Sequence, residues 1–150
     1  MILTTAILNE ARSWIGCKET SKNRSECVDE IQKLYNGKVN SEAWCAKFVW
    51  AITNVACGKL RVPNPLKQTA STITMKNEAK KTLRVDKLPG VGSVFFNVRD
   101  GGGHVGFVQK IDGNYFHTIE GNTNVSGSAD GVWEKKHNLN DTAKNTNLYI

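Results

Sequence analysis

Three segments of the sequence carry residue types that together could form a nucleophilic catalyst. Cys45 stands at the expected start of a helix, where free backbone N–H groups and the helix dipole stabilise a thiolate. His104 opens an apolar run after three glycines, so a substrate chain could approach its ring closely. Glu120 follows a second apolar run and could accept a hydrogen bond from a histidine ring. This combination predicts a thiolate that attacks a carbonyl while an imidazole transfers the proton.

Each of these residues also has an ordinary structural interpretation. Cysteine is among the most buried residue types, so Cys45 could belong to a core. His104 could lie on the surface of a glycine-rich hairpin. Glu120 and Asn122 lie in TIEGNTN, whose Gly, Asn and Thr also favour a turn. Asn122 therefore either orients a histidine or shapes the turn that holds Glu120.

The remaining histidines and cysteines are interpreted as structural. His117 lies inside an expected strand, and we expect the charge of two preceding lysines to keep His137 neutral and exposed. The four cysteines show no CxxC or zinc-finger spacing, so no zinc site is predicted. A bridge between Cys17 and Cys27 would require an oxidising compartment and is not expected. Cys57 is interpreted as a core residue.

Apolar residues recur at helical spacing in three stretches of the first 58 residues. Each stretch is followed by a glycine, which is suited to end a helix. Ser25 is a candidate cap of the second helix, and Asn40 and Ser41 are candidate caps of the third. The expected helices are residues 4–15, 25–36 and 43–57, ended by Gly16, Gly37 and Gly58.

The second half of the chain is rich in β-branched and aromatic residues separated by turn residues. Two prolines interrupt the middle of the chain, where we expect a short helix at 68–80. The segment 112–114 predicts a hairpin turn. Helices followed by an antiparallel sheet define an α+β fold. The expected strands are residues 94–98, 105–111, 115–119 and an edge strand at 148–150.

The size and apolar pattern of the chain limit its class. A length of 150 residues fits one domain with a real core. No apolar run approaches the length that spans a bilayer. The N-terminus lacks a basic start and an uninterrupted apolar stretch, so we expect no signal peptide and synthesis in a cytoplasm.

The net charge of +6 is concentrated in one segment. Residues 59–87 hold eight of the 20 Lys and Arg but two of the 14 Asp and Glu. This basic segment could bind an anionic polymer or lipid, or it could be a solvated surface. Nucleic acid is not the expected partner, because the sequence has no helix-turn-helix, zinc or RNA-recognition signature.

Three motifs of the sequence resemble the CHAP family, the cysteine, histidine-dependent amidohydrolases/peptidases. They are EAWCAKFV at 42–49, GGGHVGFV at 101–108 and HTIEGNTN at 117–124. The opening ILNEARSWIGCKE is similar to the first helix of the family, and GVGSVFFN to the strand before the histidine. The resemblance covers most of the chain and implies a papain-like α+β fold, with one catalytic domain over residues 1–150.

The resemblance also implies roles for individual residues. Trp44 either walls the substrate cleft or belongs to the core, and Gly103 would let a substrate chain approach closely. Some relatives bind calcium through an acidic loop, but the acidic residues at 26–30 fall within an expected helix, so we predict neither a metal nor a cofactor. The implied site consists of Cys45 as nucleophile, His104 as base, Glu120 as the residue that orients the base, and Asn122 as a fourth member.

The function implied by the resemblance is hydrolysis of bacterial peptidoglycan. The bond would be that of an endopeptidase or an N-acetylmuramoyl-L-alanine amidase, as in phage endolysins. We expect a monomer that reaches the wall or periplasm after release, with the segment 59–87 holding it on anionic envelope polymers. Two alternatives stay open: a catalytically silent wall-binding module, and a cysteine peptidase that acts on an amide outside the wall.

Overall fold

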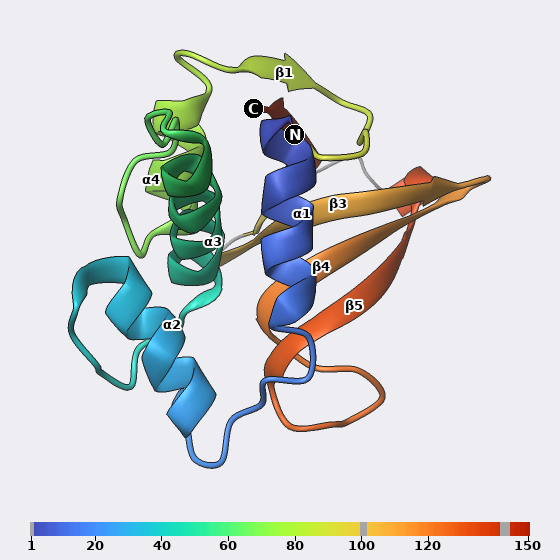
Figure 1. Ribbon diagram of the computed structural model, residues 1–150. Helices are drawn as coiled ribbons and strands as arrows, with labels where there is room; N and C mark the ends of the chain where they lie inside the picture. The colour runs from blue at the N-terminus through green and yellow to red at the C-terminus, as the bar shows by residue number, and fades with distance from the viewer. Residues whose placement is uncertain (1, 100–101, 142–144) are drawn as a thin grey trace.

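The described residues contain four α-helices, one short 3-10 helix at Leu139–Asp141 and a six-stranded antiparallel sheet (Figure 1). The computed structural model describes residues 2–99, 102–141 and 145–150. The expected α+β arrangement, with helices first and the sheet after them, is confirmed. The helices are α1 (Leu3–Ser13), α2 (Glu26–Asn36), α3 (Cys45–Leu60) and α4 (Thr72–Ala79). The strands are β1 (Arg84–Asp86), β2 (Val94–Arg99), β3 (Gly102–Asp112), β4 (Tyr115–Thr123), β5 (Gly131–Asn138) and β6 (Asn145–Tyr149).

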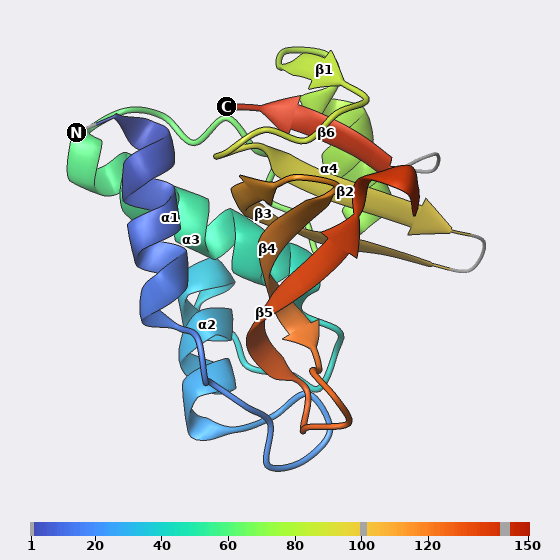
Figure 2. The ribbon, with the colours of Figure 1, turned by 90° about the vertical axis from the view of Figure 1, so that its right-hand side faces the viewer.

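Helix α3 is the central helix of the core. It packs against α1, α2, β3 and β4, and both views show it beside α1 on the same side of the sheet (Figures 1 and 2). Its apolar residues face almost every direction, which is typical of a buried helix. Aromatic edge contacts join it to the sheet, where Phe48 meets Phe107 with ring centroids 6.2 Å apart.

The bounds of α3 differ from the expected 43–57. The helix begins at Cys45 and its cap, Trp44, makes no side-chain capping bond, so neither Asn40 nor Ser41 caps it. It continues through Gly58 and ends with Arg61 in the left-handed region at φ 56°. A glycine inside a helix costs only about 1 kcal/mol, which the packing of a buried helix offsets.

Helix α2 has the ends that the sequence predicts. Ser25 accepts a hydrogen bond from the backbone N–H of Val28 at 3.1 Å, and Gly37 closes the helix at φ 77°. Helix α1 is shorter than expected, because it ends at Ser13.

The strand order is β1-β6-β2-β3-β4-β5. The C-terminal strand β6 was expected at an edge, but it lies between β1 and β2. One edge of the sheet is β1, which has three residues. The other edge is β5, a strand that the sequence pattern did not predict. The chain after α1 lies against the start of β5, where Lys18 and Gly131 form an isolated bridge.

Strands β3 and β4 form the hairpin that positions the candidate site. Its turn at Gly113 was predicted, and Asp112 pairs with Tyr115 across it. Both strands are longer than expected: β3 begins at Gly102, and β4 continues to Thr123. Glu120 and Asn122 therefore lie within β4 rather than in a turn after it.

Candidate active site

Cys45, the expected nucleophile, is held at the first position of α3. The Cys45 side chain is largely buried, with its Sγ 3.6 Å from the hydroxyl oxygen of Thr72. Burial alone would raise the pKa of Cys45. Hydrogen bonds from His104, from Thr72 and from the backbone N–H of Ala46 outweigh burial and lower that pKa. The arrangement therefore favours a thiolate.

His104, the expected base, is held by the pairing of β3 and β4. Gly106 pairs with Glu120, and His104 lies two residues before Gly106 on the same face of the sheet. His104 Nε2 lies 2.7 Å from Glu120 Oε1 in an ion pair, which leaves Nδ1 as the nitrogen for Cys45. Burial opposes the charge on the ring, but contacts with Cys45 and Glu120 outweigh it and raise the pKa of His104 to about 9.

Glu120 is a fully buried carboxylate with both oxygens in use. Oε1 faces His104, while Oε2 lies 2.6 Å from His137 Nε2 and accepts a hydrogen bond from the Thr118 hydroxyl. Burial would raise the pKa of Glu120, but the contacts with His104 and His137 lower it well below its ordinary range. Gly106 makes room for this side chain, because a Cβ there would lie 2.6 Å from Glu120 Cγ.

The position of His137 corrects the expectation that it is exposed, because its side chain is half-buried. Its ring stacks on Phe116, with centroids 5.0 Å apart and planes at 22°, and also contacts Phe95. Neighbouring residues of a strand point to opposite faces, so Lys136 turns away to lie over the Tyr115 ring. Lys136 therefore leaves His137 free to reach Glu120, and Lys135, on the same face as His137, donates to the Asn124 carbonyl instead.

Asn122 contacts the start of α3 rather than the ring of His104. It follows Glu120 at a β-bulge and has φ 58°, a left-handed conformation that asparagine tolerates. With its amide assigned from the surrounding donors and acceptors, Asn122 donates to Glu19 Oε2 and accepts from the backbone N–H of Trp44, each at 3.3 Å. It thus fixes the residue that precedes Cys45.

Glu19 is a contributor that the sequence reasoning missed. Its Oε2 also accepts a hydrogen bond from Trp44 Nε1 at 3.1 Å, and its Oε1 accepts one from the backbone N–H of Asn23. Trp44 is fully buried, which favours its core role over a place on the cleft wall. No local pattern marks Glu19 as part of the site, because Trp44 and Asn122 lie 25 and 103 residues further along the chain.

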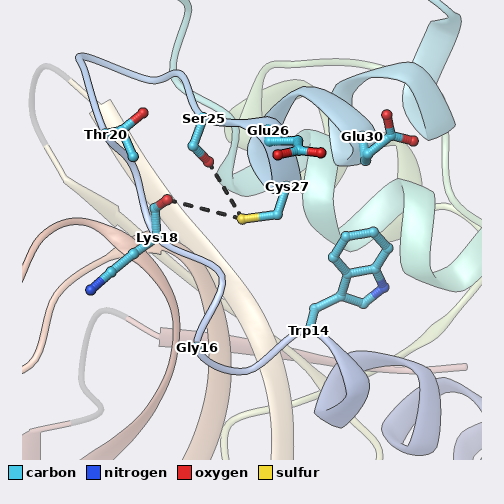
Figure 3. A pocket seen from close by; sticks show the side chains of 8 residues that line it. All are labelled: Trp14, Gly16, Lys18, Thr20, Ser25, Glu26, Cys27 and Glu30. Carbon is cyan, nitrogen blue, oxygen red and sulfur yellow. Dashed lines mark hydrogen bonds between the residues drawn. The ribbon is translucent and has the colours of Figure 1, made fainter.

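Cys17 and Cys27 form a disulfide, which corrects the expectation that they stay apart. That expectation rested on the cellular compartment in which the protein is made, and not on the distance between the two cysteines. The bridge closes the segment that carries Glu19. Figure 3 shows Cys27 with Ser25 and the Lys18 carbonyl at the edge of a pocket of about 460 Å³, with the Trp14 indole on the other side.

Gly103 lies against α4, where a Cβ would be 3.1 Å from Thr72 Cγ2. The glycine therefore lets Thr72 approach Cys45, a contact that the sequence reasoning did not find. Gly101, another residue of the predicted glycine turn, lies outside the described residues.

A polar cavity of about 290 Å³ adjoins the histidine pair. His104, Glu120, Asn122 and His137 line it together with Lys135, whose Nζ donates to the Asn124 carbonyl at 2.7 Å. The cavity gives a polar group of a substrate a place next to the base.

The described part of the chain contains neither a cluster of metal-binding side chains nor a helix that could cross a membrane. In residues 2–99, 102–141 and 145–150, no three or more His, Cys, Asp or Glu side chains are arranged to hold a metal ion. The acidic residues of the expected helix do lie in α2, where Asp29 pairs with Arg24 at 2.7 Å. None of the helices among these residues has the length and apolar character to cross a membrane.

The fold and the cysteine–histidine–glutamate cluster define a class of thiol-dependent hydrolases. A comparison with protein families matches the CHAP domain over residues 37–122, more than half of the chain, and the chain therefore belongs to the CHAP family. The predicted resemblance is thus confirmed.

Among solved structures, the crystal structure of Ly7917 is similar over 97% of this chain, with a TM-score of 0.58 and 14% sequence identity. This likeness shows a shared fold. The chain spans 61% of the length of that structure. A search of curated proteins found no match.

Proposed function

We propose that this protein is an endolysin-like peptidoglycan hydrolase that cleaves an amide bond of the bacterial cell wall through a Cys45 acyl-enzyme. The observation that carries the proposal is the paired state of the site. Contacts with His104 and Thr72 lower the pKa of Cys45, and contacts with Cys45 and Glu120 raise the pKa of His104 to about 9, so the site favours a thiolate beside an imidazolium. The CHAP family supplies the substrate class, because its members act on amide bonds, commonly those of peptidoglycan.

In the acylation step, Cys45 Sγ attacks the carbonyl carbon of the scissile amide. The backbone N–H of Cys45, at the N-terminus of α3, donates to the oxyanion. The C–N bond then breaks, His104 gives its proton to the leaving amine, and a thioester remains on Cys45.

In the deacylation step, neutral His104 takes a proton from water, and the hydroxide attacks the thioester carbonyl. The C–S bond breaks, the thiolate–imidazolium pair is restored, and the released carboxylic acid loses its proton to the solvent. Glu120 stabilises the charge on His104 in both steps and sets the orientation of the ring.

Disulfides persist outside the reducing cytoplasm, and peptidoglycan also lies outside it. The Cys17–Cys27 disulfide therefore supports action at the wall. We place the enzyme at the wall after its release from the cell in which it is made. The exposed basic residues of the segment 59–87 would keep it on anionic envelope polymers.

The test compares Cys45→Ala with Cys57→Ala, the change at the other free cysteine, which is buried in α3. The rate at which a suspension of purified peptidoglycan clears should be at least about a thousandfold lower with Cys45→Ala than with wild type. The Cys57→Ala protein should keep most of the wild-type rate. Mass spectrometry of the fragments then names the bond: free stem peptides indicate an amidase, and new peptide termini indicate an endopeptidase.

Two results would contradict the proposal. Equal clearing by wild type and Cys45→Ala would remove Cys45 from the chemistry. No release from walls of several cross-link types would exclude the wall substrate, and a labelled peptide amide would then separate a peptidase with another substrate from a silent module.

A further inference from the structure

We propose that His137 is a positioning residue of this active site, which acts on His104 through Glu120. The inference rests on the proposed function, since it concerns the same site. It adds a fourth side chain to the row that begins at the nucleophile: Cys45, His104, Glu120 and His137.

The first argument is the geometry around the carboxylate. His104 and His137 approach different oxygens of Glu120, at 2.7 Å and 2.6 Å. A carboxylate held at one oxygen can rotate about its terminal torsion, which is broad for glutamate. A second donor on the other oxygen removes this freedom and fixes the plane in which Oε1 meets His104.

The second argument is the placement of the His137 ring itself. Phe116 and Phe95 hold its faces, so the ring has a defined plane with Nε2 directed at Glu120. The register of β4 and β5 sets Phe116 opposite His137, and alternation along β4 brings Glu120 to the same face. The support therefore comes from two paired strands rather than from a flexible loop.

The third argument is the cost of leaving the second oxygen without this donor. Glu120 is 1% exposed, so water cannot replace a lost partner fully. Thr118 would remain as a neutral donor to Oε2. Lys135, the other charged group that lines the adjoining cavity, is bound to the Asn124 carbonyl. Loss of His137 should thus leave Oε2 with the Thr118 hydroxyl alone, which restrains the carboxylate less firmly than two donors do, and should weaken its hold on His104.

The experiment uses a matched pair of substitutions at the same position. His137→Gln places an amide N–H close to the position of Nε2, whereas the amide of His137→Asn is one methylene shorter and falls short of Glu120. His137→Phe keeps the stacking surface and removes the donor. His117→Phe is the control, because His117 lies elsewhere on β4, 3.9 Å from Asp112.

The first readout is the rate at which iodoacetamide alkylates Cys45, measured by mass spectrometry between about pH 5 and pH 9. The rate reports the thiolate that His104 stabilises and needs no wall substrate. We expect His137→Phe and His137→Asn to lose about five- to tenfold in rate on the acid limb of the profile, which corresponds to an upward shift of that limb by about 0.7 to 1 pH unit. His137→Gln and His117→Phe should follow wild type.

The second readout is the kinetics of amide cleavage, in which kcat should fall in the Phe and Asn variants while KM stays unchanged. Thermal unfolding of each variant shows that the compared proteins are folded. Coincident alkylation profiles for wild type, His137→Asn and His137→Phe would overturn the inference, and so would a His137→Gln protein as impaired as His137→Asn. If the alkylation profiles shift but no protein cleaves peptidoglycan, the proposed function fails and the role of His137 stands.

Discussion

Glu120 is the residue on which the electrostatics of the site depend. Burying an unpaired carboxylate costs several kcal/mol, so such a charge persists only where donors surround it. Two histidines and the Thr118 hydroxyl supply these donors. The ionised carboxylate in turn keeps His104 protonated in the company of the Cys45 thiolate.

The pH dependence of kcat/KM should show the consequence. Its acid limb follows formation of the Cys45 thiolate, whose pKa is lowered, and its basic limb follows loss of the His104 proton near pH 9. Glu120→Gln removes the negative charge that raises the pKa of His104. The basic limb should therefore move to lower pH by about one unit or more, with roughly 10- to 100-fold slower residual turnover. A basic limb that stays at its wild-type position would contradict this role of Glu120.

The sequence shows the reacting residues better than the residues that support them. The proposed nucleophile and the proposed base lie in local motifs, next to a helix start and a glycine run, where their residue types already suggest chemistry. Thr72, Glu19 and His137 carry no such local signal. They reach the site because α4, the disulfide-closed segment and β5 pack there, and that packing is a property of the tertiary fold.

At the scale of elements, three successive residues of β4 contact both the neighbouring strand β3 and the helix α3. Glu120 faces His104, whereas Asn122 reaches the start of α3 through the bulge. Gly121 stands between them, directly against α3. A Cβ at this position would lie 2.8 Å from Phe48 Cβ and 2.9 Å from Trp44 Cζ3.

Gly121→Ala should therefore lower the free energy of unfolding by about 1–3 kcal/mol, because α3 and β4 would have to separate. The matched change Gly58→Ala should have the opposite sign. Gly58 lies inside α3 and a Cβ there meets nothing within 4 Å, so alanine should stabilise by about 0.5–1 kcal/mol. Urea denaturation of both proteins measures the difference, and equal shifts for the two variants would refute the packing argument.

The disulfide should link stability to activity through Glu19. Reduction, or Cys17→Ser combined with Cys27→Ser, opens a short loop and should lower the free energy of unfolding by about 2–3 kcal/mol. Turnover should fall several-fold, because Glu19 then holds Trp44 less firmly ahead of Cys45. Activity and thermal melts with and without dithiothreitol check this. The double serine variant is the control, since a reductant effect that persists in it would come from elsewhere.

Local signals predicted those parts of the fold that are set locally. Ser25 and Gly37 fix both ends of α2, and the turn at Gly113 fixes the β3–β4 hairpin. Strand β5 was not predicted, because its run of glutamate, lysines and histidine lacks the alternation of apolar and polar residues that is typical of a strand. The inner place of β6 was missed because strand order depends on long-range pairing, which no single segment encodes.

At the scale of the whole molecule, the excess positive charge is concentrated in the basic segment 59–87. The segment 59–87 includes α4 and β1, which lie at the same end of the molecule (Figure 2). Some of its cations pair with acidic residues, as Lys59 does with Glu10 at 2.8 Å. The excess of positive charge remains on the surface.

Changing three exposed lysines of this segment to glutamine should weaken binding to purified walls about five- to tenfold at low salt, and less at high salt. Cleavage of a small soluble peptide amide should not change. Co-sedimentation with walls that have or lack their anionic polymers is the measurement. Equal weakening by the control set would mean that net charge matters rather than this segment. The test set is Lys67, Lys80 and Lys87, and the control set is Lys22, Lys38 and Lys110.

The two edges of the sheet also determine how the protein behaves when it is concentrated. An open strand edge invites pairing with another chain and growth of aggregates. Here one edge is the three-residue β1 with a charged residue at each end, and the other is β5, which carries adjacent lysines and is covered at its start by the bridge from Lys18 to Gly131. Both edges thus resist strand addition, so many copies brought to a high local concentration should remain separate, dispersed molecules.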